Sequence, residues 1–411
     1  MGVNIIKGLI AYDQFNGTSV TTNYLAGYNS TIVKWTTDTA KTIKTGEIWF
    51  NGTIKFVDLI PIAGLLEFDC IEVIKSLFGN FNDFIDYQIS DLVKYDGNLF
   101  KLVDVRFKVN YTDTTDDYID VTAKFLRSVR QHTDRSNGMY YFTNAGSTNS
   151  QTNFLQTCQK SKSFYNQSLK IFKGYPQDIS VIAPIANNLI SFAISTKTGT
   201  YVGTVDENIT VVSGARTNKE VQRIVLSDGQ DLRSVFNSYP ALNEGKLQIM
   251  HRPDNVSFPT NIYSFNYEIV DECGYYIKWL NTCGGFSYWL FNKNSRNIIS
   301  TKNKGTISVN AGQLGYNADE INIGVDAAEK LQLTAQNIEP EFINHLLEIA
   351  NSPCVYLYMK PKGSLAYANG NSDVWLKIPQ VIDFKYTKKS ETNRYQIGFE
   401  LDLPKIYTQT L

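Results

Sequence analysis

Few charges, few histidines and no long apolar run set the first limits on this sequence of 411 residues. Charged residues make up only 19%, and 39 Lys and Arg against 40 Asp and Glu leave a net charge of −1. General nucleic-acid binding needs a basic surface that displaces counterions from phosphates, so that class is disfavoured. The longest apolar run, residues 59–66, is far too short to cross a bilayer. We therefore expect contacts with proteins or neutral ligands, and no membrane insertion.

The five cysteines are odd in number, widely spaced and without a C-x-x-C pair. Disulfide-stapled secreted modules are short and dense in cysteine, so we expect a chain that stays reduced. A bond between Cys273 and Cys283 across a hairpin is the less favoured alternative. No basic start followed by an apolar run opens the sequence, and we expect no signal peptide.

Catalytic motifs are missing as well. The sequence contains no G-x-S-x-G, H-E-x-x-H, G-x-x-x-x-G-K-[ST] or G-x-G-x-x-G pattern. Of the three histidines, His345 is expected on one face of a helix, His132 in a solvated polar loop and His251 at the end of a strand. We assign no catalytic, cofactor-binding or metal-binding residues, and we expect neither a cofactor nor enzymatic activity.

The cluster of Asp113, Asp116 and Asp117 invites a calcium-binding interpretation. An EF-hand loop counted from Asp113 places Tyr118 where Gly is required and Lys124 where a bidentate Glu is required, so that motif fails. A solvated hairpin loop is the favoured prediction, and a looser calcium-binding turn stays open.

Strand patterns dominate the sequence. Asn51-Gly52 separates two short apolar segments, and this pair tolerates the positive φ angles of a tight hairpin turn. Apolar and polar residues alternate along 99–109, 118–125 and 262–270. Residues 274–291 predict a further hairpin whose second strand is apolar on both faces, which indicates burial on both sides. The predicted fold class is mainly β, built from several sandwich-like or barrel-like modules with a few short helices.

Only one helix is clearly predicted, at about residues 339–350. Pro340 stands near its first turn, apolar residues recur at helical spacing, and Pro353 stops it. A shorter helical run is expected within residues 69–78.

Domain limits follow from polar stretches. Residues 143–151 are small and polar and make the best linker, and a second polar stretch covers 291–306. We predict three β-rich domains, the last of which carries the clear helix: residues 1–165, 166–300 and 301–411.

Aromatic residues are abundant, at 13% with 25 Tyr and 23 Phe. Stacking on sugars uses such residues, and so do β-sandwich cores and protein interfaces. Four tryptophans lie in predicted strands and alternate with other apolar residues: Trp49, Trp279, Trp289 and Trp375. We favour core and interface, and we expect the hairpin at 274–291 to lie in a domain core.

Two motifs carry a resemblance. The segment Ile171-Phe172-Lys173-Gly174-Tyr175-Pro176 precedes a predicted strand, and residues 273–291 follow the pattern Y-x-x-W…GG-x-x-x-W-x-F. The predicted helix is then followed by strands near 352–357, 375–378 and 395–403. Together these features, over residues 166–411, resemble tail structural proteins of tailed bacteriophages that infect Bacteroidetes, including the crAss-like phages. Residues 1–165 carry no such resemblance.

The resemblance implies a non-enzymatic virion protein, made in the cytoplasm of the bacterial host, that forms a ring or tail-barrel component around the ejection channel. Its partners would be further copies of itself, in a homo-oligomeric ring of six- or twelve-fold symmetry, and neighbouring tail and portal-proximal proteins. DNA would only pass through the channel, whose face we expect to be acidic or neutral.

Two other classes of protein stay open. A receptor-binding β-protein of the phage would bind host glycans through exposed Tyr and Trp side chains gathered in one groove. A β-rich glycan hydrolase would need two carboxylates facing each other across a cleft, and the sequence nominates no such pair. A trimer in solution would favour the receptor-binding class.

Overall fold

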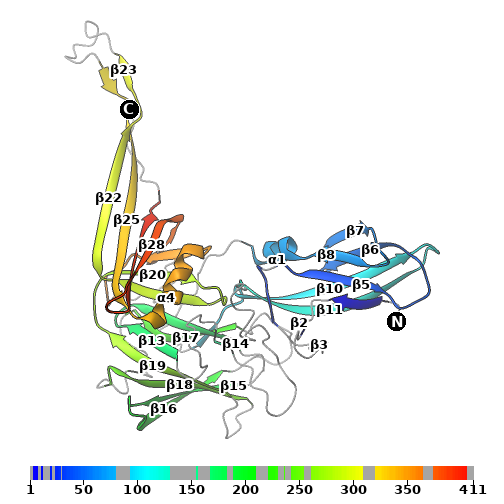
Figure 1. The fold of residues 1–411 in the computed structure, drawn as a ribbon, viewed down its shortest axis with the longest axis horizontal. Helices are drawn as coiled ribbons and strands as arrows, with labels where there is room; N and C mark the ends of the chain where they lie inside the picture. The colour runs from blue at the N-terminus through cyan, green and yellow to red at the C-terminus, as the bar shows by residue number, and fades with distance from the viewer. Residues whose placement is uncertain are drawn as a thin grey trace.

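A computed structural model describes most of the chain (Figure 1). The described residues are 3–7, 11–12, 19–20, 24–28, 30–79, 93–129, 154–155, 167–182, 188–209, 221–229, 236, 242–253, 261–308, 320–363 and 374–404. Strands dominate them and form several separate sheets, with a few short helices between. The predicted mainly β fold class is confirmed.

The N-terminal sandwich, at the right of Figure 1, packs two sheets around one core. One sheet has the order β1 (Val3–Lys7), β5 (Ile32–Thr37), β8 (Leu66–Asp69). The other has the order β4 (Tyr24–Ala26), β11 (Asp116–Leu126), β10 (Phe100–Tyr111), β6 (Ile43–Phe50), β7 (Ile54–Leu59). Helix α1 (Ile71–Phe78) closes the core, which buries Trp35 and Phe107, and β2 (Ala11–Tyr12) pairs antiparallel with β3 (Ser19–Val20).

The hairpin expected at Asn51-Gly52 is confirmed. Asn51 has a φ of 49° and Gly52 a φ of 68°, so both central residues of the turn between β6 and β7 are left-handed. The alternation that predicts strands at 99–109 and 118–125 is confirmed too, because β10 and β11 pair along their whole length. From Val103 to Tyr111 the inward residues of β10 are buried and its outward residues are half-buried or exposed, whereas on β11 the inward residues are buried only towards its end, at Ala123 and Phe125.

Two further sheets occupy the middle of the chain. One has the order β12 (Phe154–Leu155), β14 (Pro176–Ile182), β17 (Val221–Asp228), β9 (Val93–Tyr95). The other has the order β13 (Gln167–Phe172), β19 (Asn261–Val270), β18 (Glu244–Pro253), β15 (Asn188–Ser195), β16 (Tyr201–Ile209). A shared core contains Phe192, Ile224 and Phe265. β9 belongs by sequence to the N-terminal part yet pairs with β17, so the two parts are interlocked.

Two sheets and a helix form the C-terminal part. One sheet has the order β21 (Phe286–Phe291), β20 (Tyr275–Leu280), β26 (Val355–Tyr358), β27 (Trp375–Ile378). The other has the order β22 (Lys293–Asn303), β25 (Val325–Ile338), β29 (Arg394–Asp402), β28 (Gln380–Lys389). Helix α4 (Pro340–Leu347) and the 3₁₀ turn η2 (Glu348–Asn351) confirm the helix expected at 339–350, and α1 confirms the one within 69–78. All six residues of β21 are buried, as expected from its two apolar faces.

A two-stranded arm projects from this C-terminal part, at the upper left of Figure 1. From Lys330 to Thr334, β25 pairs with β22 on one side and with β29 on the other. Residues 325–329, at the N-terminal end of β25, pair with β22 alone. The ribbon continues into β23 (Thr306–Ser308) and β24 (Glu320–Asn322). We call the described residues 299–308 and 320–329 the arm. Its strand β22 accounts for the polar stretch at 291–306, because a ribbon with water on both faces needs no apolar alternation.

Only one of the two predicted domain limits falls within the described residues. The limit at residue 300 lies inside β22, and the sheet of β20, β21, β26 and β27 takes strands from both sides of it. The limit at 165 and the linker at 143–151 lie outside the described residues. The three-domain division therefore stays a prediction.

The cysteines depart from expectation at one position. Cys283 is disulfide-bonded, whereas Cys70, Cys273 and Cys354 are free. The expectation of a fully reduced chain is therefore wrong at Cys283, and Cys273 is not its partner. Spacing along a sequence does not reveal which loops meet in space, so connectivity could not be derived from it.

Candidate functional site

Most of the aromatic side chains in the described part of the chain are buried in hydrophobic cores. Trp279 is fully buried, and Trp289 and Trp375 are nearly so. Tyr276 lies at the centre of a group of rings, 4.7 Å from Tyr175 between ring centroids. The assignment of the hairpin at 274–291 to a domain core is confirmed. Trp49 differs, because it stands on the outward face of its sheet.

A cluster of charges lies within this core. The Arg223 side chain is fully buried, with Nη2 2.5 Å from Asp178 Oδ2 and Nη1 3.3 Å from Asp96 Oδ2. The Tyr288 hydroxyl donates to the same Asp178 oxygen at 2.7 Å. The Arg223 guanidinium lies 4.6 Å from the ring centroid of Phe286. The cluster thus links the sheet of β14 and β17 to β21, a strand of the C-terminal part.

Lys278, also fully buried, extends the cluster from β20. Its ammonium lies 4.2 Å from the ring centroid of Trp375 and 5.1 Å from that of Tyr356. Aromatic faces carry partial negative charge and stabilise a desolvated cation. Because both carboxylates that flank Arg223 are at most 2% exposed, a dissolved substrate does not reach them. The cluster therefore holds sheets together.

His345 lies on the buried face of α4, with its ring centroid 5.0 Å from that of Trp279. Burial lowers the pKa of His345 to about 4, although a hydrogen bond with the backbone of Tyr288 opposes the shift. The prediction of a helix-face residue is confirmed, and the face is the buried one. His251 lies near the end of β18, as expected, and His132 lies outside the described residues.

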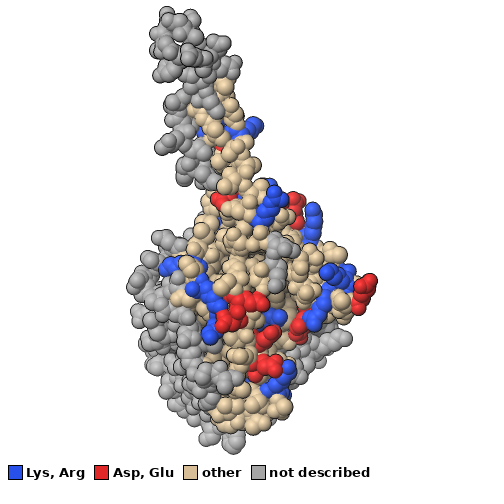
Figure 2. Space-filling view, turned by 90° about the vertical axis from the view of Figure 1, so that its left-hand side faces the viewer, with Lys and Arg blue, Asp and Glu red and all other residues tan. Residues whose placement is uncertain are grey.

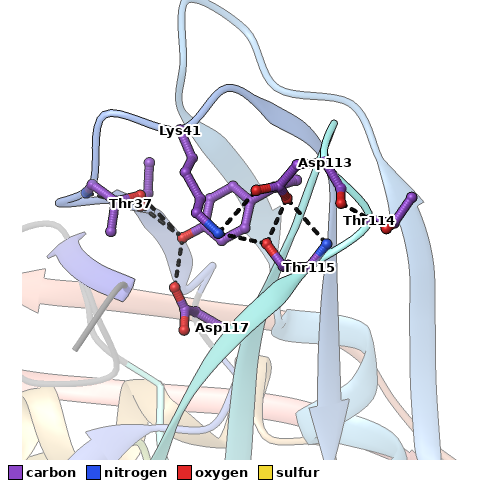
Figure 3. A network of polar contacts seen from close by, with 8 residues as sticks. Thr37, Lys41, Asp113, Thr114, Thr115 and Asp117 are labelled. Carbon is purple, nitrogen blue, oxygen red and sulfur yellow. Dashed lines mark hydrogen bonds and ion pairs between the residues drawn. The ribbon is translucent and has the colours of Figure 1, made fainter.

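The acidic turn joins β10 to β11 and is a hairpin loop, as predicted (Figure 3). Asp113 accepts hydrogen bonds from the Thr115 hydroxyl and backbone N–H, and Lys41 Nζ lies 2.9 Å from its other oxygen. These bonds, that of the Thr115 hydroxyl first, lower the pKa of Asp113 to about 2. Asp117 instead accepts a hydrogen bond from the Tyr111 hydroxyl at 2.9 Å. The carboxylates therefore serve separate partners, and in the described part of the chain no metal-binding group of His, Cys, Asp or Glu forms.

The outward face of β6, β10 and β11 holds a shallow hollow of about 460 Å³. Its lining includes Trp49, Arg106 and Asp120, one from each strand. Arg106 donates two hydrogen bonds to Asp120, at 2.7 and 2.8 Å, and these lower the pKa of the carboxyl group. Lys55 Nζ lies 4.3 Å from the Trp49 ring centroid, and the Arg106 guanidinium lies over the exposed ring of Tyr118. The face offers aromatic rings beside fixed polar groups.

An exposed apolar loop lies between β7 and β8. We define the apolar loop as residues 60–65, in which Ile60 is 79% and Ile62 78% exposed. The loop is held in one shape by reciprocal backbone bonds between Ile62 and Leu65, at 2.8 and 3.0 Å. The Thr36 hydroxyl also donates to the Gly64 carbonyl at 2.7 Å. Large side chains are thus presented to solvent on a rigid turn.

The sequence alone did not indicate the charge cluster around Arg223, the hollow on β6, β10 and β11, or the exposure of the apolar loop. The members of the charge cluster come from distant segments, so no spacing pattern points to them. The apolar loop falls in the longest apolar run, a pattern that ordinarily indicates burial. Within the charge cluster, only Lys278 has a signal in the sequence, because it is the single charged residue of the apolar segment 274–291.

Comparison with known proteins leaves the family open. No protein-family model matches the chain, and no curated protein is significantly similar to it in sequence. Among the described helices, none is long and apolar enough to span a membrane.

Proposed function

We propose that this chain is a non-enzymatic structural subunit of a bacteriophage tail that assembles as a ring around the ejection channel. Its place would be the virion, after synthesis in the bacterial host cytoplasm. Its partners would be further copies of itself and neighbouring tail and portal-proximal proteins. Function would then reside in interfaces between subunits.

The projecting arm carries this proposal. A two-stranded ribbon is marginally stable by itself in water, because it cannot bury a face. The arm nevertheless extends well beyond the third strand, β29, and its Ile299 is 62% exposed. A subunit that reaches onto a neighbour gives such a ribbon the surface it lacks.

The charge pattern supports the same proposal. On the face seen in Figure 2, Lys and Arg side chains are interspersed with Asp and Glu, over the body and at the base of the arm. A net charge of −1 gives copies little reason to repel one another. The resemblance of residues 166–411 to phage tail proteins, noted from the motifs above, points the same way.

Light scattering on the purified chain, followed by negative-stain imaging, tests the proposal. Closed rings of six or twelve copies are the expected result. A monomer at all concentrations up to about 100 µM would contradict self-assembly, because subunit interfaces of ordinary size associate well below that concentration. A trimer would favour the receptor-binding alternative.

The hollow on the N-terminal sandwich favours a second candidate function, the binding of host glycans by a phage receptor-binding protein. Trp49 offers an aromatic surface, and the Arg106–Asp120 pair offers fixed hydrogen-bonding groups beside it. Such pairing suits a neutral sugar, since the cation is already matched by a carboxylate. An array of neutral oligosaccharides probes this candidate: Trp49→Ala should abolish binding, while Tyr201→Ala, at an exposed site on β16, should leave it unchanged.

A further inference from the structure

We propose that the hollow on β6, β10 and β11 binds a neutral sugar by two adjacent hydroxyl groups, which donate hydrogen bonds to Asp104 beside the Trp49 ring. The inference rests on the second candidate function, the binding of host glycans, and deepens it by naming the residue that selects the ligand. Asp104 is the one charged residue of the lining without a charged partner among the described residues.

Two rows of side chains cross the sheet under the hollow. Trp49, Arg106 and Asp120 stand opposite one another in the first row. Asp104 and Thr122, two residues along the same strands, form the second. Asp104 is therefore a diagonal neighbour of Trp49, and such neighbours on one face of a sheet are about 7–8 Å apart. A sugar ring spans that gap, and the volume of about 460 Å³ is within the range of small-molecule sites.

The charges of the lining are unequal, because it contains two carboxylates and one guanidinium. Arg106 directs Nε and Nη2 at the two oxygens of Asp120, so this cation is already matched. Asp104 forms no ion pair with a described residue, and only its Oδ1 accepts a side-chain hydrogen bond from one, that of the Thr122 hydroxyl at 2.6 Å. An ionised carboxylate has about four acceptor sites, so Asp104 retains room for two further donors.

This arrangement defines the chemistry of the ligand. Adjacent hydroxyls of a sugar offer two donors to the two oxygens of one carboxylate, and hydrogen bonds to a charged acceptor are stronger than neutral ones. The apolar face of the sugar ring then lies against Trp49. A sugar acid would bring a third carboxylate to the lining and be repelled by its like charge. The hollow therefore favours neutral sugars over acidic ones.

Both contact groups are fixed before a ligand arrives. The backbone N–H of Asp104 donates to the side-chain oxygen of Asn51 at 2.9 Å, which ties the strand to the neighbouring turn. Trp49 Nε1 donates to Glu47 at 2.9 Å, and Lys55 lies over one face of the ring. The other face is left for the sugar. Binding therefore orders few further groups.

An array tests the class of ligand. It carries neutral oligosaccharides of glucose, galactose and mannose, together with chitotriose, which bears ammonium groups, and trigalacturonate, which bears carboxylates. The full chain should bind neutral members that expose two adjacent hydroxyls and should not bind trigalacturonate. Binding confined to chitotriose or to trigalacturonate would overturn the proposed ligand class.

Calorimetry with the preferred sugar tests the role of Asp104. Asp104→Asn keeps the size of the side chain and an acceptor for Thr122, but it should weaken binding about 10-fold or more because a charged acceptor is lost. The matched control is Asp58→Asn, an exposed carboxylate of the same sandwich outside the hollow, at a positive φ that Asn tolerates. It should bind like the wild type. Unchanged melting temperatures show that both variants fold.

Deoxy analogues show which groups meet. A methyl glycoside that lacks one hydroxyl of the pair should bind the wild type about 10-fold more weakly than its parent, yet bind Asp104→Asn as its parent does. Binding that Trp49→Ala abolishes and Asp104→Asn leaves unchanged overturns the role of Asp104 and leaves the glycan-binding function standing. A wild type that binds no neutral oligosaccharide, or whose binding survives Trp49→Ala, overturns both.

Discussion

Replacing Arg223 by Met should strongly destabilise the core between the central sheet of β17 and the C-terminal strand β21. Arg223 is fully buried, and its guanidinium contacts carboxylates of Asp178 and Asp96 that are 2% and 1% exposed. Removing the cation leaves two desolvated negative charges close together. Breaking a buried ion pair from one side costs about 3–5 kcal/mol in the free energy of unfolding. Urea unfolding, followed by tryptophan fluorescence at pH 7, measures this loss.

Two further variants separate the charge from the packing. Arg223→Met with Asp178→Asn removes one of the stranded charges and should recover part of the loss. Arg106→Met breaks an Arg–Asp pair with Asp120 on the surface, where solvent screens both charges. It should cost far less. If Arg223→Met were no more destabilising than Arg106→Met, the argument from burial would be refuted.

Three other changes have defined outcomes. Trp279→Ala should cost about 3–5 kcal/mol, since the ring is fully buried; an unchanged melting temperature would contradict its core placement. The pKa of His345 is lowered to about 4 in the fold from an ordinary 6.5, so the unfolded chain takes up this proton first as pH falls. Stability should therefore decline between pH 6.5 and 4, by about 3 kcal/mol from this residue, and urea titrations of His345→Gln should show a flatter profile. Gly245→Ala places a methyl group 2.4 Å from the Ser195 carbonyl oxygen and should cost about 1–3 kcal/mol by thermal melting; a neutral effect would show that the strand yields there.

Local patterns in the sequence predicted local structure well. The Asn51-Gly52 turn, the strand at 118–125 and the helix at 339–350 depend on neighbouring residues, whose spacing is visible in one dimension. Burial of both faces of β21 followed from its unbroken apolar run. In each case the same few residues both carry the signal and form the element.

Non-local features had no such signal. β9 pairs with β17, a strand more than a hundred residues away in the sequence. The polar strand β22 was taken as a boundary between domains, because both its faces are exposed to solvent in the arm and it therefore lacks apolar alternation. The apolar loop had no sequence signal of exposure, since apolar runs are typical of buried segments whereas Ile60 and Ile62 are exposed. The candidate surfaces therefore became visible only once the strands were placed in space.

The pairing of β9 with β17 has a mechanical consequence. Hydrogen bonds in an antiparallel ladder run perpendicular to the strands, so a pull along β9 loads them together in shear. Arg223, which is part of that ladder, also contacts through its side chain both Asp96, the residue that follows β9, and Asp178. Tension on the N-terminal sandwich would thus pass into the central sheet through strand and side chain at once. This junction would therefore resist separation of the N-terminal sandwich from the central sheet under tension.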